Sequence, residues 1–145
     1  MQGYPGSKAA DQYLAQRVEG ASPEQLVAML LEAGQKFLTL VIAAIASNDI
    51  AAKARHANRV SDIILELSQR LNRVDGGEVV TNLDRIYKWW MNDLFDAARQ
   101  NETPRLESMR NQMNIMRNTW EELHRKKMLA LAPASAPVSM DEMVG

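Results

Sequence analysis

The chain has 145 residues and a formal net charge of −1, which fits a single soluble domain with a buried core. This near-neutral charge argues against broad electrostatic capture of nucleic acid or of an acidic membrane. The sequence contains no cysteine, which excludes disulfides, zinc–thiolate sites and cysteine nucleophiles and fits a cytoplasmic location.

Residues 1–20 are predicted to form a flexible N-terminal segment with one short helix. Residues 1–7 contain two glycines and a proline, residues 9–18 have helical character, and Gly20 ends that helix. Residues 1–11 lack the apolar core of a signal peptide, and the longest apolar-rich stretch, residues 38–46, is too short to cross a bilayer. We therefore expect neither a secretion signal nor membrane insertion.

The next predicted helix, residues 23–47, begins with an explicit start signal. Ser22 can cap the helix, Pro23 suits its first turn, and Gln25 completes a capping box. Asn48 and Asp49 are expected to end it. Neither this segment nor any other alternates with a period of two, so we predict no β-strands.

Three further helices are predicted over residues 52–73, 78–101 and 104–129. A turn at residues 75–77 (Asp-Gly-Gly) and a cap-and-proline pair, Thr103 and Pro104, separate them. Short connections favour an up-down order. The expected fold is all-α: an antiparallel up-down four-helix bundle over residues 21–129, with a short N-terminal helix. Residues 130–145 contain too few apolar residues to offset the entropy of ordering and are predicted to be a disordered C-terminal tail.

A helical wheel assigns one apolar stripe of each helix to the core. In chain order the predicted stripes are Leu26, Leu30, Phe37, Val41 and Ala44; Val60, Ile64, Leu67 and Leu71; Leu83, Tyr87, Trp90, Met91 and Leu94; and Met109, Met113, Met116, Trp120 and Leu123. Because adjacent helical residues diverge by roughly 100°, Trp89 and Trp90 cannot both point into one narrow stripe.

More apolar residues flank these stripes than a bundle helix needs. On residues 23–47 the apolar arc exceeds half of the circumference, whereas a peripheral helix typically needs little more than roughly 100°. The flanking residues are Met29, Leu31, Leu38, Leu40, Ile42, Ile63, Leu65, Ile86 and Phe95, whereas Trp89 falls among polar neighbours. Two explanations remain open: the helix is buried on both sides or covered by the N-terminal segment, or it offers a groove to a partner helix.

The chemical motifs do not assemble into a catalytic or metal site. Glu121 and His124 have the three-residue spacing used by di-iron bundles, but the second histidine, His56, has Lys53 at the matching position. His56 and His124 are therefore interpreted as helix-surface residues. No nucleophile system and no phosphate-binding loop is visible. We expect a protein that is not an enzyme and that needs no metal or cofactor.

Four local patterns resemble the flagellar secretion chaperone FliS family. They are Tyr13 and Val18 followed by Ser-Pro-Glu-Gln-Leu-Val-Ala-Met-Leu at residues 22–30; the apolar helix at residues 60–71; Asp-Gly-Gly-Glu at residues 75–78 with Leu83, Ile86, Tyr87 and Leu94; and Leu106 with Trp120. The chain departs from the family at Leu31, where a tyrosine is usual, at residues 32–34 (Glu-Ala-Gly), and at Trp89, the second aromatic of a Tyr-x-Tyr pattern.

The resemblance implies a cytoplasmic, flagellin-specific chaperone of type III export. Such a chaperone binds the C-terminal helical segment of flagellin, prevents premature polymerisation, and helps deliver the client to the flagellar export gate as a chaperone–flagellin complex. The expected partner-binding residues are Tyr13, Val18, Leu31, Leu38, Ile42, Ile63, Leu65, Ile86, Tyr87 and Trp89, with the first two forming an N-terminal cover.

We expect a monomer or weak homodimer. The alternative is a self-associating regulatory or adaptor bundle that uses the same apolar flanks for a homodimer interface.

Overall fold

The computed structural model describes residues 19–71 and 77–131. Four helices occupy most of this range: α2 (Pro23–Ala46), α3 (Ile50–Leu71), α4 (Glu78–Arg99) and α5 (Thr103–Leu131). The described residues contain no strand, so the all-α prediction is confirmed, and every helix end lies within two residues of its expected position. The expected short helix at residues 9–18, with Tyr13 and Val18, lies outside the described residues. The predicted tail began at residue 130, but α5 includes residues 130 and 131, and the rest of the tail lies outside the described residues.

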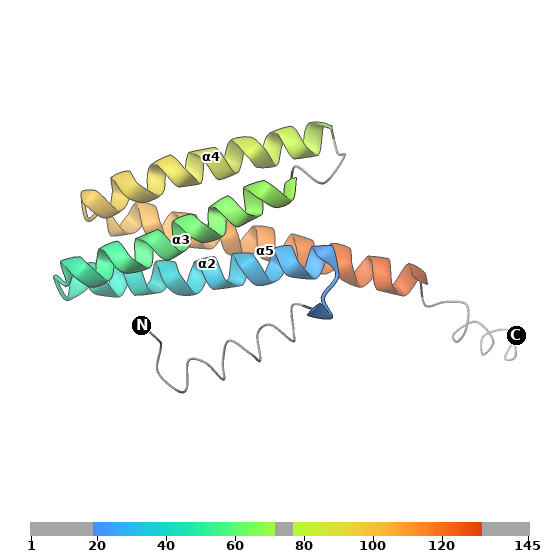
Figure 1. Ribbon diagram of the computed structural model, residues 1–145, viewed down its shortest axis with the longest axis horizontal. Helices are drawn as coiled ribbons and strands as arrows, with labels where there is room; N and C mark the ends of the chain where they lie inside the picture. Colours follow the sequence, from blue (N-terminus) through green and yellow to red (C-terminus); the bar gives the residue numbers. More distant parts are fainter. Residues whose placement is uncertain (1–18, 72–76, 132–145) are drawn as a thin grey trace, which may run out of the picture. The chain divides into compact units, whose positions relative to one another are not determined.

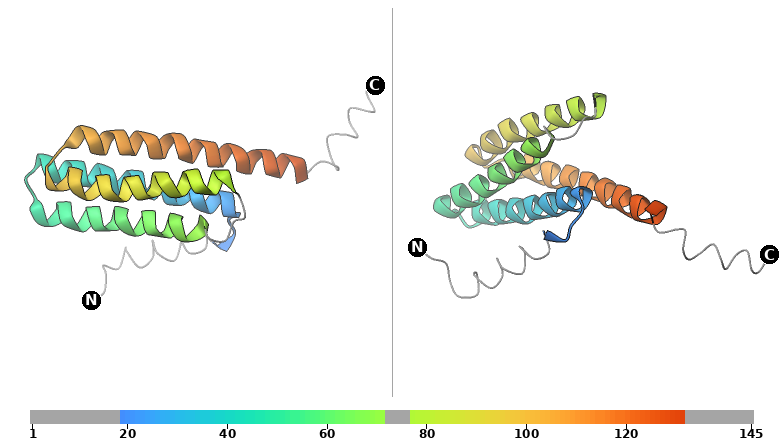
Figure 2. Two further views of the ribbon diagram at one scale, coloured as in Figure 1. Left: turned by 90° about the horizontal axis from the view of Figure 1, so that it is seen from above. Right: turned by 45° about the vertical axis from the view of Figure 1, so that its right-hand side comes forward.

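The chain divides into two compact units, which we describe separately. The larger unit comprises residues 27–118, and the described part of the smaller unit comprises residues 19–26 and 119–131. In the larger unit the four helical segments lie side by side, and successive segments run in opposite directions (Figure 1, Figure 2). This arrangement confirms the predicted up-down four-helix bundle.

Two asparagines end helices in the same way. Asn48 after α2 and Asn101 after α4 each have φ of 56°, a left-handed conformation that asparagine tolerates better than most residues. In each motif, the backbone N–H groups of the asparagine and of the following residue donate to carbonyls of the last helical turn, over 2.8 to 3.2 Å. Asp49 then starts α3 by accepting a hydrogen bond from the Ala52 N–H at 3.0 Å.

The buried residues of α3 and α4 follow the predicted stripes closely. On α3, all four predicted core residues are buried. On α4, Tyr87, Trp90 and Leu94 are buried, while Leu83 and Met91 are half-buried. Regular apolar spacing on a clearly amphipathic helix is sufficient to identify the face that packs inward.

The predicted seam on α5 is confirmed in part. Met109 and Met113 are buried in the larger unit. Met116 and Trp120 are half-buried, and Leu123 is exposed. The apolar repeat of α5 therefore extends further along the helix than its buried part does.

On α2 the predicted core stripe is confirmed only at its C-terminal end, where Val41 and Ala44 are buried. Leu31 and Leu38, which were assigned to a flank, are fully buried, whereas Leu30 and Phe37 are only half-buried. Gly34 explains the difference: a Cβ built there would lie 2.8 Å from the sulfur of Met113 on α5. The missing side chain lets the two helices approach closely, so the face centred on Gly34 turns inward. A wheel that counts apolar side chains cannot detect this.

By length and composition alone, α2 could cross a membrane. A central helix of a bundle satisfies the same test. The residues between its buried positions include charges: Glu32 pairs with Arg117 of α5 at 3.4 Å, and Lys36 is exposed. Buried leucines on one face and charges on the other are the features of a bundle helix.

The smaller unit joins the start of α2 to the last turns of α5. The capping box is confirmed: the Gln25 N–H donates to Ser22 Oγ at 3.1 Å, and the Ser22 N–H donates to the Gln25 side chain at 3.2 Å. Ser22 Oγ also lies 2.8 Å from His124 Nδ1, and Lys127 pairs with Glu24 at 3.2 Å. His124 is a half-buried residue of the helix surface whose ring also bonds the cap of α2.

Candidate partner-binding surface

The predicted partner-binding residues divide into three groups by exposure. Leu65, Ile86 and Trp89 are exposed, with relative accessibilities of 50%, 36% and 50%. Ile42 and Ile63 are half-buried. The buried group consists of Leu31, Leu38 and Tyr87. The sequence predicted that all of these residues share one apolar surface. In the structure, some of them lie at the surface and others in the core.

For Leu31 and Leu38, the expected surface position is wrong, whereas Tyr87 is buried as its core stripe predicted. Leu31 and Leu38 lie on the face of α2 that Gly34 brings toward α5. Tyr87 packs beside Trp90, with ring centroids 5.7 Å apart, and its hydroxyl donates to the sulfur of Met116 at 3.8 Å. Burial raises the pKa of Tyr87 to about 12. A partner could reach these side chains only if helices separated.

The two adjacent tryptophans of α4 have opposite roles. Trp90 is fully buried, and its indole N–H donates to the side-chain oxygen of Gln112 on α5 at 2.7 Å. Trp89 is half-exposed. The prediction that the two rings cannot share one face is confirmed. Tryptophan is a common anchor for protein recognition, because it offers a large apolar surface with one polar group.

An apolar patch follows the outer side of the contact between α4 and α5. The bonds from Trp90 to Gln112 and from Tyr87 to Met116 fix the register of these antiparallel helices. Ile115 lies between the two α5 contacts in sequence, and its side chain is 58% accessible. We infer from this register that Ile115 borders Ile86 and Trp89, and we call these three residues the α4–α5 patch.

An ion-pair network fixes the same two helices near the α4–α5 turn. The guanidinium of Arg105 bonds Asp93, and it bonds Asp96 at 2.9 Å and Glu102 at 3.1 Å. The bond to Asp93 is the main reason that the pKa of Arg105 is raised, and the bond from Arg105 holds the pKa of Asp96 below its usual value. These contacts connect α4 to the start of α5 near the turn.

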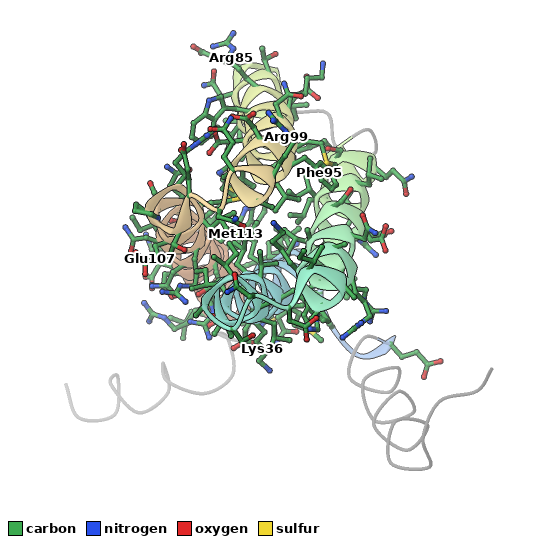
Figure 3. All side chains as sticks on the ribbon, turned by 90° about the vertical axis from the view of Figure 1, so that its left-hand side faces the viewer. Lys36, Arg85, Phe95, Arg99, Glu107 and Met113 are labelled. Atoms are coloured by element: carbon green, nitrogen blue, oxygen red, sulfur yellow. The ribbon has the colours of Figure 1, made fainter. Side chains whose placement is uncertain are left out.

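A second exposed apolar set lies where α3 meets α4. Leu65 on α3 and Phe95 on α4 are 50% and 43% accessible. The Ser61 hydroxyl donates to the sulfur of Met91 at 3.4 Å and so registers the two helices. Figure 3 shows Phe95 extending from α4 on the side of α3. Phe95 and Trp89 therefore occupy different sides of α4.

The described residues show no feature that points to chemistry. Among residues 19–71 and 77–131, no group of histidine, aspartate and glutamate is arranged to hold a metal ion. A small pocket of about 160 Å³ lies at the α2–α3 turn. Its lining residues are Ala44, Ile45, Asn48, Asp49, Ile50, Lys53 and Asn101, none of which was a predicted partner-binding residue. A pocket of this size could hold a single side chain rather than a helix.

Ile115 was not among the predicted partner-binding residues. Ile115 lies between Met113 and Met116 but outside the methionine repeat of α5. In the sequence it therefore looks like an isolated exposed apolar residue. A wheel shows that Ile115 points away from the seam, but its position beside α4 depends on how the two helices pack. Only the register of α4 against α5 reveals that it extends the surface of Trp89.

Comparison with known proteins connects this bundle to flagellar export. The family model described as flagellar protein FliS matches residues 6–127. The flagellar secretion chaperone FliS of Vibrio cholerae is 26% identical over 107 residues, covering 74% of this chain and 79% of that protein. FliS of Salmonella typhimurium is 26% identical over 110 residues, covering 75% and 82%, and FliSB of Pseudomonas aeruginosa is 27% identical over 118 residues, covering 79% and 94%. A helical bundle with exposed apolar side chains agrees with these matches, and the chain belongs to the FliS family of flagellar secretion chaperones.

Proposed function

We propose that this chaperone binds the C-terminal helical segment of flagellin in the cytoplasm, prevents its premature polymerisation, and helps deliver it to the flagellar export gate. The proposal involves no catalytic step and no cofactor. The single observation that carries it is the exposure of Trp89 on the helical bundle, together with the exposure of Ile86 and Ile115. A free chaperone of this kind is a monomer or a weak homodimer.

The physical argument concerns apolar surface on both partners. A helix that is apolar on one side and destined for burial in a filament aggregates unless that side is covered. A stable bundle can cover it without refolding, while the client gains helical order only on binding. Ordering the client reduces the net affinity, so the complex can be released for export.

The α4–α5 patch is tested with the double variant Trp89→Ala and Ile115→Ala. We expect its affinity for flagellin, measured by isothermal titration calorimetry, to fall about 10- to 100-fold, as for loss of an aromatic anchor and its apolar neighbour. Because both side chains are exposed, the helical circular dichroism and the thermal midpoint should change little. Flagellin lacking its C-terminal segment should show no binding to either protein.

Phe95→Ala is the matched control, since it removes an exposed aromatic from the other side of α4. Normal affinity in the double variant would reject the patch, and a selective loss in Phe95→Ala would move the client to the α3–α4 side. Substitutions at Leu38 would not serve, because that residue is fully buried. In sedimentation, a tight homodimer that ignores flagellin would favour the adaptor alternative.

A further inference from the structure

We propose that the side where α2 meets α3 is a second docking surface, which accepts an acidic amphipathic segment of a partner protein. Its residues are Lys36, Phe37 and Leu40 from α2 and Arg55, His56 and Arg59 from α3. We call it the basic α2–α3 face. It shares no residue with the α4–α5 patch, so flagellin and this second partner would contact different helices.

Phe37 joins the two helices on this face. Its ring stacks on His56 with centroids 6.2 Å apart, and the guanidinium carbon of Arg59 lies 5.1 Å from the ring centre. His56 is therefore half-buried against Phe37, which corrects its interpretation as a solvated surface residue. Leu40, one turn further along α2, is 41% accessible. The face thus has an apolar strip that Arg59 borders.

The cations of this face differ from most others in the larger unit. Arg70, Arg99 and Arg117 each pair with a carboxylate, whereas Arg55 and Arg59 have none within 4.0 Å among the residues that the structure describes. Residues 50–61 contain no acidic residue at all. Arg55 and Arg59 lie one turn apart and so occupy neighbouring positions on α3. Their charge is left for a partner to neutralise.

Lys36 extends the positive charge onto α2. It is exposed, precedes Phe37 and lies one turn before Leu40. Figure 3 shows its side chain projecting outward from α2, away from the interior of the bundle. Cations on both helices therefore flank the strip formed by Phe37 and Leu40.

This pattern selects an acidic segment that is also apolar. A simple polyanion would meet the cations but leave Phe37 and Leu40 uncovered. A helix with leucines on one side and carboxylates on both borders would satisfy both features. Charge complementarity of this kind determines partner choice and association rate, and salt screens it.

The test uses a designed peptide of about 18 residues, long enough to form a helix on binding, with leucines three and four apart and glutamates between them. Titrated into the ¹⁵N-labelled full chain, it should shift the amide signals of Lys36, Leu40, Arg55 and Arg59. The double variant Arg55→Glu and Arg59→Glu should weaken binding at least about tenfold. Arg85→Glu is the matched control, because Arg85 is exposed on α4 and points away from the bundle (Figure 3).

Polyglutamate of equal length distinguishes docking from plain charge attraction. Leu40→Gln should weaken the leucine-containing peptide and leave polyglutamate unaffected. Equal affinity for the two peptides, or equal losses in Arg85→Glu and in the double variant, would overturn the proposal. Shifts confined to Ile86 and Trp89 would overturn it too, and would assign the peptide to the α4–α5 patch. Flagellin binding measured in parallel keeps the two proposals separate.

Discussion

At the scale of single residues, Trp89 and Trp90 differ sharply in exposure although they are neighbours on α4. Trp90 supplies the core with a large ring whose only polar group bonds Gln112. Trp89 keeps half of its surface accessible to solvent. The helix therefore places a buried and an exposed tryptophan roughly 100° apart, one in the core and one available at the surface.

Tyr87 provides a pH test of the core. Burial raises its pKa to about 12, whereas an unfolded tyrosine titrates near about 10. Between these values the unfolded chain loses the proton and the folded chain keeps it, so rising pH favours unfolding. The free energy of unfolding should fall by up to about 1.4 kcal/mol per pH unit in this window. Below the window Tyr87 is protonated in both states, so it adds no pH dependence and its full stabilisation is present.

Tyr87→Phe should lack this additional slope, although it also loses the hydroxyl bond to Met116. Urea unfolding of both proteins at pH 9 and at pH 11.5 measures the difference. If both proteins lose the same stability over that interval, Tyr87 ionises freely in the native state and its assignment to the core is contradicted.

At the scale of elements, Asn48 and Asn101 determine where α2 and α4 end. Their positive φ angles cost a residue with a Cβ and no local polar group about 1–2 kcal/mol. We expect Asn48→Ala and Asn101→Ala each to destabilise the protein by about 1 kcal/mol, and the glycine variants at both positions to be at least as stable as the original.

Thermal unfolding compares these variants with Asn92→Ala, which lies on the exposed side of α4. Alanine is the better helix former there, so Asn92→Ala should be neutral or slightly stabilising. An Asn101→Gly protein less stable than Asn101→Ala would show that the left-handed turn is not what ends α4.

Helix boundaries and the inward faces of α3 and α4 could be predicted from the sequence because the responsible signals are local. Ser22 and Gln25 form their capping box within one turn, and Val60 and Ile64 repeat with the helical period. The inward face of α2 could not be predicted, since it depends on the close approach that Gly34 allows to α5. The two apolar faces of α2 are similar in hydrophobicity, so packing against the other helices determined which one is buried.

At the scale of the whole molecule, the chain belongs to a family of secretion chaperones and exposes apolar side chains on the larger unit. Three of the eight predicted binding residues in the described range are core residues, because a wheel measures hydrophobicity and not which side the other helices leave open. Trp89 and Ile86 were identifiable from sequence, since they lie off the core stripe. Ile115 required the register of α4 against α5.

The central claim is that Trp89 contacts flagellin directly, and site-specific photo-cross-linking tests it. A photoreactive benzoylphenylalanine is placed at residue 89, and the same group replaces Asp62, an exposed residue of α3, as the control. After irradiation of each complex, mass spectrometry should locate cross-links from residue 89 in the C-terminal segment of flagellin, with few or none from residue 62. Intact complexes with no cross-link from residue 89, or with equal cross-linking from residue 62, would contradict the account.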